Sequence, residues 1–243
     1  MKRFLILIYF LSSTIVYAHT INWYSYGRLI QTTTCDAGDN IVPPTPSKYG
    51  YHFSHWEALY TQIKYIQGSA TTACYIDTKY SPKSTTRIRA KFQFGSTAND
   101  KSLVFGGSNG GFELYPWDHN LEFNYGGSNN FGASVQDNDI VELDWNQNIV
   151  NYTINSTYDH TLILPNKSFS GGNSLYIFTL HRAIRQNDMK LYYFQIYDNG
   201  TLVRDFIPVL DKEGVPCLID RIEHKYYYNL GSCNFIAGPL INE

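Results

Sequence analysis

The chain has 243 residues, of which 16% are aromatic and 16% are charged, and its 19 basic and 21 acidic residues leave a net charge of −2. The charged fraction is below the usual ~25%, and the abundance of Tyr, Thr, Asn and Gly favours β-structure over coiled coils, helical bundles and disorder. Because Lys and Arg are neither numerous nor clustered, no nucleic-acid partner is expected.

Residues 1–18 have the pattern of a secretory signal peptide. Lys2-Arg3 forms a short basic region, an apolar run follows over residues 4–16, and Val16-Tyr17-Ala18 places small residues at the −3 and −1 positions of a cleavage site. The apolar run is shorter than the ~20 residues of a membrane span. The sequence therefore predicts an exported mature chain, residues 19–243, that is secreted, periplasmic or associated with the cell surface, without a stable membrane span.

Two short strands are predicted next, at Ile21–Tyr24 and Leu29–Thr34. A Pro-rich break at residues 42–46 and a Gly-Tyr-x-Phe-x-x-Trp motif at residues 50–56 follow. Together these features resemble one internalin-type B-repeat, and the resemblance implies a small β-grasp-like unit over residues 19–57. The alternative is an irregular N-terminal arm that packs on the main domain.

Short predicted strands alternate with turns rich in Gly, Asn, Asp and Pro from residue 58 onward. The clearest is Arg87–Phe94, in which apolar residues occupy every second position from Ile88 to Phe94. This period of two predicts a half-buried antiparallel strand with one wet face. Similar runs occur at Leu121–Tyr125, Ile140–Trp145, Leu175–Leu180, Leu191–Tyr197 and Lys225–Tyr228. Many strands at such spacing predict an all-β fold, a two-sheet antiparallel sandwich or jelly roll.

A hairpin is predicted at Asp198–Thr201, because Asn-Gly at its tip is the strongest short signal for a type I′ turn. With a two-residue loop, Asp205 would lie opposite Phe194 and share its face with the apolar residues Ile196, Val203 and Ile207. A carboxylate on such a face must find hydrogen-bond donors. We therefore expect Asp205 to fix a neighbouring loop through backbone amides, the alternative being a catalytic or metal-binding role.

Residues 190–209, which contain this hairpin, are similar to the C-terminal signature of laminin-G-like domains of the concanavalin A-like lectin/glucanase class. The domains meant are those of bacterial surface proteins and phage structural proteins. The similarity continues at residues 219–220, 227–231 and 235–239 and, upstream, at residues 63–66 and 75–78. It implies a two-sheet jelly roll over residues 58–243 but no particular ligand, since a fold alone does not define a function.

Glucanases of that class hydrolyse glycans with carboxylates spaced along one strand as Glu-x-Asp-x-x-Glu or Glu-x-Asp-x-Glu. Here Glu142 and Asp144 fall on one face of a predicted strand, but the third position is Asn146 or Gln147, which cannot transfer a proton as a carboxylic acid does. The sequence also lacks Gly-x-Ser-x-Gly and His-Glu-x-x-His motifs. We therefore expect a wet strand face at Glu142 and no enzyme activity.

Redox and metal chemistry are weakly indicated. After export, the four cysteines can form zero, one or two disulfides, and full pairing is possible in three ways. The cysteines are Cys35, Cys74, Cys217 and Cys233. Without CxxC spacing or a neighbouring His pair, no zinc site is expected. The turns at residues 36–39 and 137–139 each hold two aspartates, too few ligands for a calcium loop. No cofactor is predicted, and Ca²⁺ is left open.

Ligand binding is better supported than catalysis. Sugars are bound by aromatic faces together with planar hydrogen-bonding side chains. Such groups come together around Pro116, at Tyr115, Trp117, Asp118, His119 and Asn120. Pro116 predicts that this segment leaves the sheet, which would make Trp117 an exposed stacking platform. The alternative is an aromatic residue that caps the core at a sheet edge.

The sequence thus predicts an exported, non-catalytic recognition or adhesion protein that binds a glycan or a cell-surface protein. One alternative is a structural spacer with no small ligand. The other is a glycoside hydrolase, which the missing third carboxylate disfavours.

Overall fold

The computed structural model describes residues 19–25, 28–35, 41–47, 60–95, 103–107, 111–180 and 187–241. Every regular element in these ranges is a β-strand, so the predicted all-β fold is confirmed. The chain divides into two compact units, residues 1–57 and residues 58–243. The predicted signal peptide and the Gly-Tyr-x-Phe-x-x-Trp motif lie outside the described residues. Within the described ranges, no helix has the length and apolar character needed to cross a membrane.

The described part of the first unit contains an antiparallel pair of strands, β1 (His19–Ser25) and β2 (Arg28–Cys35), where two strands were predicted. The indole N–H of Trp23 donates to Oγ1 of Thr33 at 2.9 Å, and the hydroxyl of Thr32 donates to Oδ1 of Asn22 at 2.8 Å. Most of β2 is exposed. This ribbon is therefore held by its backbone ladder and polar cross-strand pairs rather than by an apolar core.

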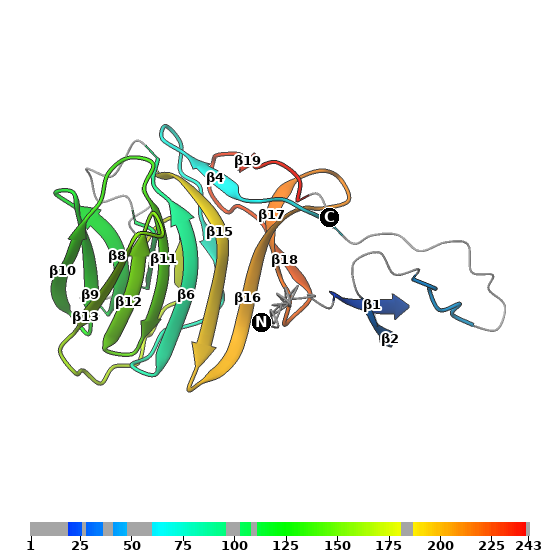
Figure 1. The fold of residues 1–243 in the computed structure, drawn as a ribbon, viewed down its shortest axis with the longest axis horizontal. Helices are drawn as coiled ribbons and strands as arrows, with labels where there is room; N and C mark the ends of the chain where they lie inside the picture. Colours follow the sequence, from blue (N-terminus) through cyan, green and yellow to red (C-terminus); the bar gives the residue numbers. More distant parts are fainter. Residues whose placement is uncertain are drawn as a thin grey trace, which may run out of the picture. The chain divides into compact units, whose positions relative to one another are not determined.

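The described residues of the second unit form two antiparallel sheets (Figure 1). The smaller sheet has six strands, in the order β10 (Ser128–Ser134), β9 (Asn120–Tyr125), β8 (Phe112–Trp117), β7 (Phe105–Gly107), β14 (Leu175–Ile177) and β5 (Ile76–Asp77). The main path of the larger sheet runs through β13 (Tyr158–Ile163), β12 (Ile149–Ile154), β11 (Ile140–Asn146), β6 (Thr86–Gln93), β15 (Asn187–Asp198), β16 (Thr201–Leu210), β17 (Pro216–Asp220) and β18 (Lys225–Tyr227). Shorter strands joined to it are β3 (Thr61–Gln62), β4 (Ile66–Ser69) and β19 (Ile236–Ala237).

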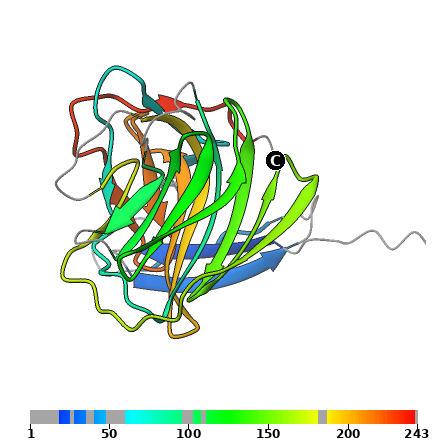
Figure 2. The same cartoon turned by 90° about the vertical axis from the view of Figure 1, so that its left-hand side faces the viewer.

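The period-two patterns give each sheet an inner face toward the core and an outer face. In β6, Ile88, Ala90 and Phe92 are fully buried, while the residues between them are only partly buried. β11 alternates in the same way, with Leu143 and Trp145 on the buried side. Figures 1 and 2 show β6, β15 and β16 side by side in this order in the larger sheet. The sandwich-like arrangement expected from the sequence is therefore present.

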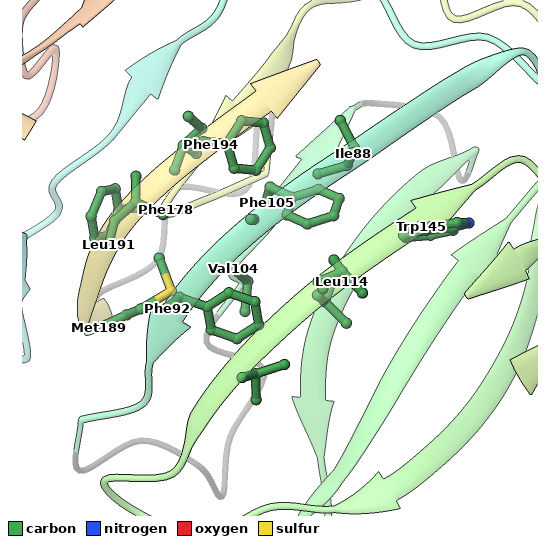
Figure 3. Close-up of a cluster of buried hydrophobic side chains, with 14 of the residues drawn as sticks. Ile88, Phe92, Val104, Phe105, Leu114, Trp145, Phe178, Met189, Leu191 and Phe194 are labelled. Atoms are coloured by element: carbon green, nitrogen blue, oxygen red, sulfur yellow. The ribbon is translucent and has the colours of Figure 1, made fainter. Parts of the chain in front are cut away.

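Aromatic side chains fill the space between the two sheets (Figure 3). Phe112 stacks on Trp145 with ring centroids 4.3 Å apart, and Phe105 packs edge-on against Phe194 at 5.3 Å. The indole N–H of Trp145 donates to the carbonyl of Gln147 at 2.7 Å, so the polar atom of this buried ring is satisfied. Since each fully buried large apolar side chain contributes about 1.5–3 kcal/mol, this cluster stabilises the packing of one sheet on the other.

A disulfide joins Cys74 to Cys233, which lie 159 positions apart in the sequence. Asn229 reinforces this connection: its Oδ1 accepts from the amide of Tyr75 at 2.9 Å, and its Nδ2 donates to the carbonyl of Cys233 at 2.6 Å. The segment after β18 is therefore anchored to the residues that precede β5.

Cys217 is a buried thiol, and burial raises its pKa to about 12.

The first and last described segments of the second unit lie together. β19 pairs with β4, and Ile63 forms an isolated antiparallel bridge with Leu240. The amide of Lys64 donates to the carbonyl of Pro239 at 2.9 Å. The first and last described segments of this unit therefore enter and leave the fold side by side.

The hairpin between β15 and β16 has the predicted turn. Asn199 and Gly200 have φ angles of 51° and 83°, and a type I′ turn requires positive values at both positions. The pairing of the two strands shifts, however, at a β-bulge between Ile196 and Tyr197. A bulge adds one residue to one strand and so exchanges the faces of the residues beyond it.

This bulge changes the surroundings of Asp205. Asp205 lies opposite Gln195 rather than Phe194, so the predicted pairing was wrong, while Ile207, two residues further along β16, shares its face as predicted. Its carboxylate accepts from Nε2 of Gln195 at 3.0 Å and forms an ion pair with Nη2 of Arg221 at 2.7 Å. Asp205 therefore fixes the turn after β17, as expected, but through side chains and not through backbone amides.

Candidate functional site

The segment predicted to bind a ligand forms the tip of the β8–β9 hairpin. Tyr115 and Trp117 belong to β8, Asn120 begins β9, and Asp118 and His119 form a two-residue turn with φ angles of 46° and 61°. The expectation that this segment leaves the sheet was therefore wrong.

Pro116 is tolerated within β8 because of its position. It lies opposite Leu121, next to the pair that closes the two-residue loop, so its nitrogen points away from β9. On that other side, within the described residues, β7 pairs with β8 only as far as Leu114. Proline therefore removes no ladder hydrogen bond here, and the strand continues to Trp117.

The strand register brings several of these side chains together on the outer face of the small sheet. Trp117 lies opposite Asn120, and Tyr115 lies opposite Glu122. On the next strand, Phe131 of β10 lies opposite Glu122 as well. These five residues are called the aromatic face below. Of the five predicted site residues, three lie on the aromatic face and two form the turn at its end.

Two rings of the aromatic face are exposed, Trp117 with 40% and Phe131 with 56% of its surface accessible. They are two strands apart and two register positions apart. For a strand spacing of ~4.8 Å and a rise of ~3.3 Å per residue, this corresponds to about 12 Å between their Cα atoms. Exposed aromatic side chains gathered on one sheet face are candidates for ligand contact.

Polar groups accompany the rings. The hydroxyl of Tyr115 donates to Oε1 of Glu122 at 2.7 Å, and Nδ2 of Asn120 donates to the carbonyl of Asp118 at 2.8 Å. Asp118 and His119 are exposed at the turn. The aromatic face thus combines two exposed rings with partly buried hydroxyl and amide groups, and exposed polar side chains lie at the turn at its end.

Sequence reasoning missed four residues of this region, Phe131, Glu113, Glu122 and Asn124. Glu122 and Asn124 alternate with apolar residues in a predicted strand, and this alternation could have placed them on its outer face. Phe131 had no such signal, because Ser128–Ser134 is a mixture of Ser, Asn, Gly and Ala around one aromatic residue.

Two carboxylates of this sheet face are buried, Glu122 within the aromatic face and Glu113 next to it on β8. Glu113 and Glu122 are only 8% and 2% exposed although both belong to the outer face. Burial, and to a smaller extent the charge of Glu122, raises the pKa of Glu113 to about 7. Since burial disfavours the charged form of a carboxyl group, Glu113 is the acid of this region that titrates near neutral pH.

A cleft of about 340 Å³ lies on the outer face of the large sheet. It is lined by Arg89, Glu142, Leu143, Asp144, Asn151, Tyr152, Thr153, Asp159, His160, Thr161 and Tyr193. The predicted alternation of β11 is confirmed here, because Glu142 and Asp144 face outward while the residues beside them are buried.

Both carboxylates of the cleft are held by neighbouring side chains. Asp144 accepts from Nε of Arg87 at 2.7 Å and lies 3.8 Å from Nε of Arg89. Glu142 accepts from the hydroxyl of Tyr193 at 3.0 Å and lies 3.4 Å from Nζ of Lys91. Burial and the charge of Glu142 raise the pKa of Tyr193. The wet strand face expected from the sequence is therefore a network of ion pairs.

Of the two acidic turns that left Ca²⁺ open, the structure describes the one at residues 137–139. In the parts of the chain that the structure describes, no group of three or more His, Cys, Asp or Glu side chains is arranged to hold a metal ion. Asp139 instead accepts from the amide of Gln136 at 2.8 Å and from Nδ2 of Asn155 at 2.7 Å. The turn at residues 36–39 lies outside the described residues.

Comparisons with known proteins bear on the fold. No model of a known protein family matches the chain, and no curated protein matches it. Among solved structures, the chain is similar to a protein from Bacteroides ovatus ATCC 8483 that is named a "putative carbohydrate binding protein", with a TM-score of 0.52 and 13% sequence identity. The match covers 74% of this chain and 61% of that protein, less than two thirds of its length. At this identity the likeness shows a shared all-β fold.

Proposed function

We propose that the protein is an exported, non-catalytic recognition or adhesion protein that binds a glycan on the aromatic face of the small sheet. The observation that carries this proposal is the pair of exposed rings, Trp117 and Phe131, on one sheet face, with the exposed polar side chains of the turn, Asp118 and His119, at its end. Aromatic rings stack on sugar rings, and planar polar side chains bind sugar hydroxyls. The name of the structural neighbour from Bacteroides ovatus points to the same class of ligand.

The spacing of the two rings favours an extended ligand. A separation of about 12 Å between strand positions is too large for one sugar ring to stack on both aromatic side chains. An oligosaccharide can place one unit on Trp117 and another on Phe131. Oligosaccharides should therefore bind more tightly than the monosaccharides of which they are composed.

The proposal includes the domain organisation and the location inferred from the sequence. Residues 1–18 act as a signal peptide, residues 19–57 form an internalin B-repeat-like unit, and residues 58–243 form a laminin-G-like domain with concanavalin A-like jelly-roll topology. The type I′ hairpin within residues 190–209 supports the last assignment. A disulfide between Cys74 and Cys233 is compatible with an oxidising compartment outside the cytoplasm.

The ion-pair network on the large sheet supports the absence of catalysis. Retaining hydrolysis needs one carboxylate nucleophile and one carboxyl group that gives up a proton. Asp144 and Glu142 are instead bonded to cations and a tyrosine hydroxyl. Incubation with β-glucans should therefore release no reducing sugar. Release that disappears in Glu142→Gln would contradict this prediction and support a glycoside hydrolase.

A glycan array with the mature chain, followed by calorimetric titration of the best ligand, tests the binding proposal. Trp117→Ala and Phe131→Ala should each weaken binding by at least ~1 kcal/mol, about fivefold, as loss of an aromatic anchor does. The melting temperature should change little, because neither ring is buried in the core. Asn151→Ala, in the cleft of the other sheet, is the matched control and should bind normally.

Other results of these binding and stability measurements would point to a different role for Trp117, a different binding site or a different partner. A large fall in melting temperature with unchanged affinity in Trp117→Ala would make this residue part of the packing. Loss of affinity only in Asn151→Ala would show that the ligand binds in the cleft of the large sheet. Failure of the chain to bind any glycan would favour a protein partner or the spacer alternative.

A further inference from the structure

The cleft on the outer face of the large sheet presents charged and polar side chains rather than aromatic rings. Leu143 and Tyr152, two of its lining residues, belong to the apolar core on the inner face. His160 lies opposite Tyr152 and stacks on its ring, with centroids 4.9 Å apart, so it faces inward as well. Tyr193 is half-buried, and its hydroxyl donates to Glu142. None of these described lining residues therefore offers an exposed ring on which a sugar could stack.

Strand pairing arranges the outward side chains of this region in two rows that cross the sheet from β6 to β13. The first row consists of Arg89, Asp144, Asn151 and Thr161, and the second of Lys91, Glu142, Thr153 and Asp159. Both rows begin with a basic residue of β6. The second row ends with an acidic residue on β13, the last strand on this side of the sheet.

Two charged side chains at opposite ends of the cleft keep capacity for binding a ligand. The guanidinium of Arg89 lies 3.8 Å from Asp144, beyond hydrogen-bond distance, whereas Arg87 donates to the same carboxylate at 2.7 Å. Asp159 is exposed and forms no hydrogen bond or ion pair in the part of the chain that the structure describes. One positive and one negative group are therefore open to a ligand.

Amide and hydroxyl groups lie between these two charges. The hydroxyl of Thr161 donates to Oδ1 of Asn151 at 2.9 Å, which fixes the amide group and leaves Nδ2 of Asn151 as a donor. The side chain of Thr153 belongs to the other row. An extended peptide carries one N–H donor and one carbonyl acceptor at each residue, so its backbone can bond to such groups.

The separation of the two open charges sets the length of a matching ligand. Arg89 and Asp159 lie three strands and two register positions apart, which corresponds to about 16 Å between their Cα atoms. An extended chain advances ~3.4 Å per residue, so residues i and i+4 are about 14 Å apart and project to the same side. Opposite charges at this spacing on a peptide therefore reach both ends of the cleft.

We propose that the cleft of the large sheet binds an extended segment of a partner protein that carries a basic side chain and, four residues away, an acidic one. The basic side chain pairs with Asp159, the acidic one pairs with Arg89, and the backbone between them bonds to Asn151. Charge complementarity favours this occupant, and the lack of an exposed ring among the described lining residues disfavours a sugar. The site lies on the other sheet from the aromatic face and does not depend on glycan binding.

An array of pentapeptides tests the proposal, followed by calorimetric titration of the best binder. The peptides have the form Lys-x-x-x-Glu or Glu-x-x-x-Lys, with β-branched residues in the middle to favour an extended chain. Counterparts with Gln at both ends should bind at least about fivefold more weakly, because they lose two exposed ion pairs. Raising NaCl from about 0.1 M to about 1 M shortens the Debye length from about 10 Å to about 3 Å and should remove most of this difference.

Variants of the two open charges test the assignment of each end. Asp159→Lys should reverse the preference at its end, so that peptides with Glu at both ends bind it more tightly than peptides with one Lys. Asp159→Asn and Arg89→Gln should each weaken binding of the best charged peptide about two- to fivefold. Lys212→Gln and Glu213→Gln remove the exposed charges of an ion pair between β16 and β17, so they are the matched controls and should bind normally.

Three results would overturn the proposal. One is that the charged peptides bind no better than their Gln counterparts, or do not bind at all. The second is an unchanged peptide preference in Asp159→Lys. The third is a loss of glycan affinity in Asp159→Lys without any peptide binding, which would show that the cleft holds a glycan. Trp117→Ala should keep full affinity for the peptide, so failure of this site and failure of the glycan site can be distinguished.

Discussion

At the scale of single residues, Glu113 should govern how stability depends on pH. The pKa of Glu113 is about 7 in the folded chain, against an ordinary value of 4.5, so the unfolded chain releases this proton first as the pH rises. The stabilisation from protonated Glu113 is therefore complete below about pH 4.5 and is lost progressively as the pH passes 7. The melting temperature should therefore fall between about pH 5 and pH 8.

The variant Glu113→Gln isolates this effect. Glutamine cannot ionise, so its melting temperature should fall less over the same pH interval. Among the described residues, Glu122 and Tyr115 are the titratable groups next to Glu113 on this sheet face, and both are retained in the variant. Equal pH profiles for the two proteins would show that Glu113 is not the group responsible.

At the scale of structural elements, the β15–β16 turn should be sensitive to its glycine. Gly200 has a φ angle of 83° and no other atom within 4 Å of the position that a Cβ atom would take. Gly200→Ala should therefore destabilise the fold by about 1 kcal/mol through backbone strain alone. Gly172 also has open space around it but no positive φ angle, so Gly172→Ala is the matched control. Urea unfolding of both variants measures the difference, and equal stabilities would refute the assignment of strain to Gly200.

Strand positions were predictable where one face is apolar and the other polar. Arg87–Phe94 is the best example, since its alternation matches the burial pattern of β6 and its bounds differ from those of β6 by one residue at each end. Asn199-Gly200 fixed the turn, but the bulge beyond it could not be read from the chain, because neither Ile196 nor Tyr197 carries a local bulge signal. The same limit applies to Phe131, whose place opposite Glu122 depends on pairing between strands and not on its own segment. The prediction that the segment around Pro116 leaves the sheet failed because a strand tolerates proline where no neighbour pairs with its nitrogen. That depends on where the neighbouring strand β7 ends.

At the scale of the whole molecule, the Cys74–Cys233 disulfide should contribute strongly to stability. It closes a loop of 159 positions, and removing a native disulfide from a small exported domain costs about 2–5 kcal/mol. The double variant Cys74→Ser/Cys233→Ser should unfold at a lower urea concentration than the oxidised chain and at the same concentration as the chain reduced before unfolding. Identical unfolding of the variant and the oxidised chain would show that the bridge is not a stabilising element.

The first and last described segments of residues 58–243 pair with each other. The strands can therefore follow one another in a different order along the chain and still form the same fold. Because the backbone around Ile63 and Lys64 is hydrogen-bonded to the backbone around Pro239 and Leu240, a short linker can join the two ends without moving either. New ends can then be opened at the exposed tip of the β15–β16 hairpin, where cutting the chain removes few contacts. The same geometry lets this unit be inserted as a cassette into a surface loop of another protein, since it needs only one point of attachment.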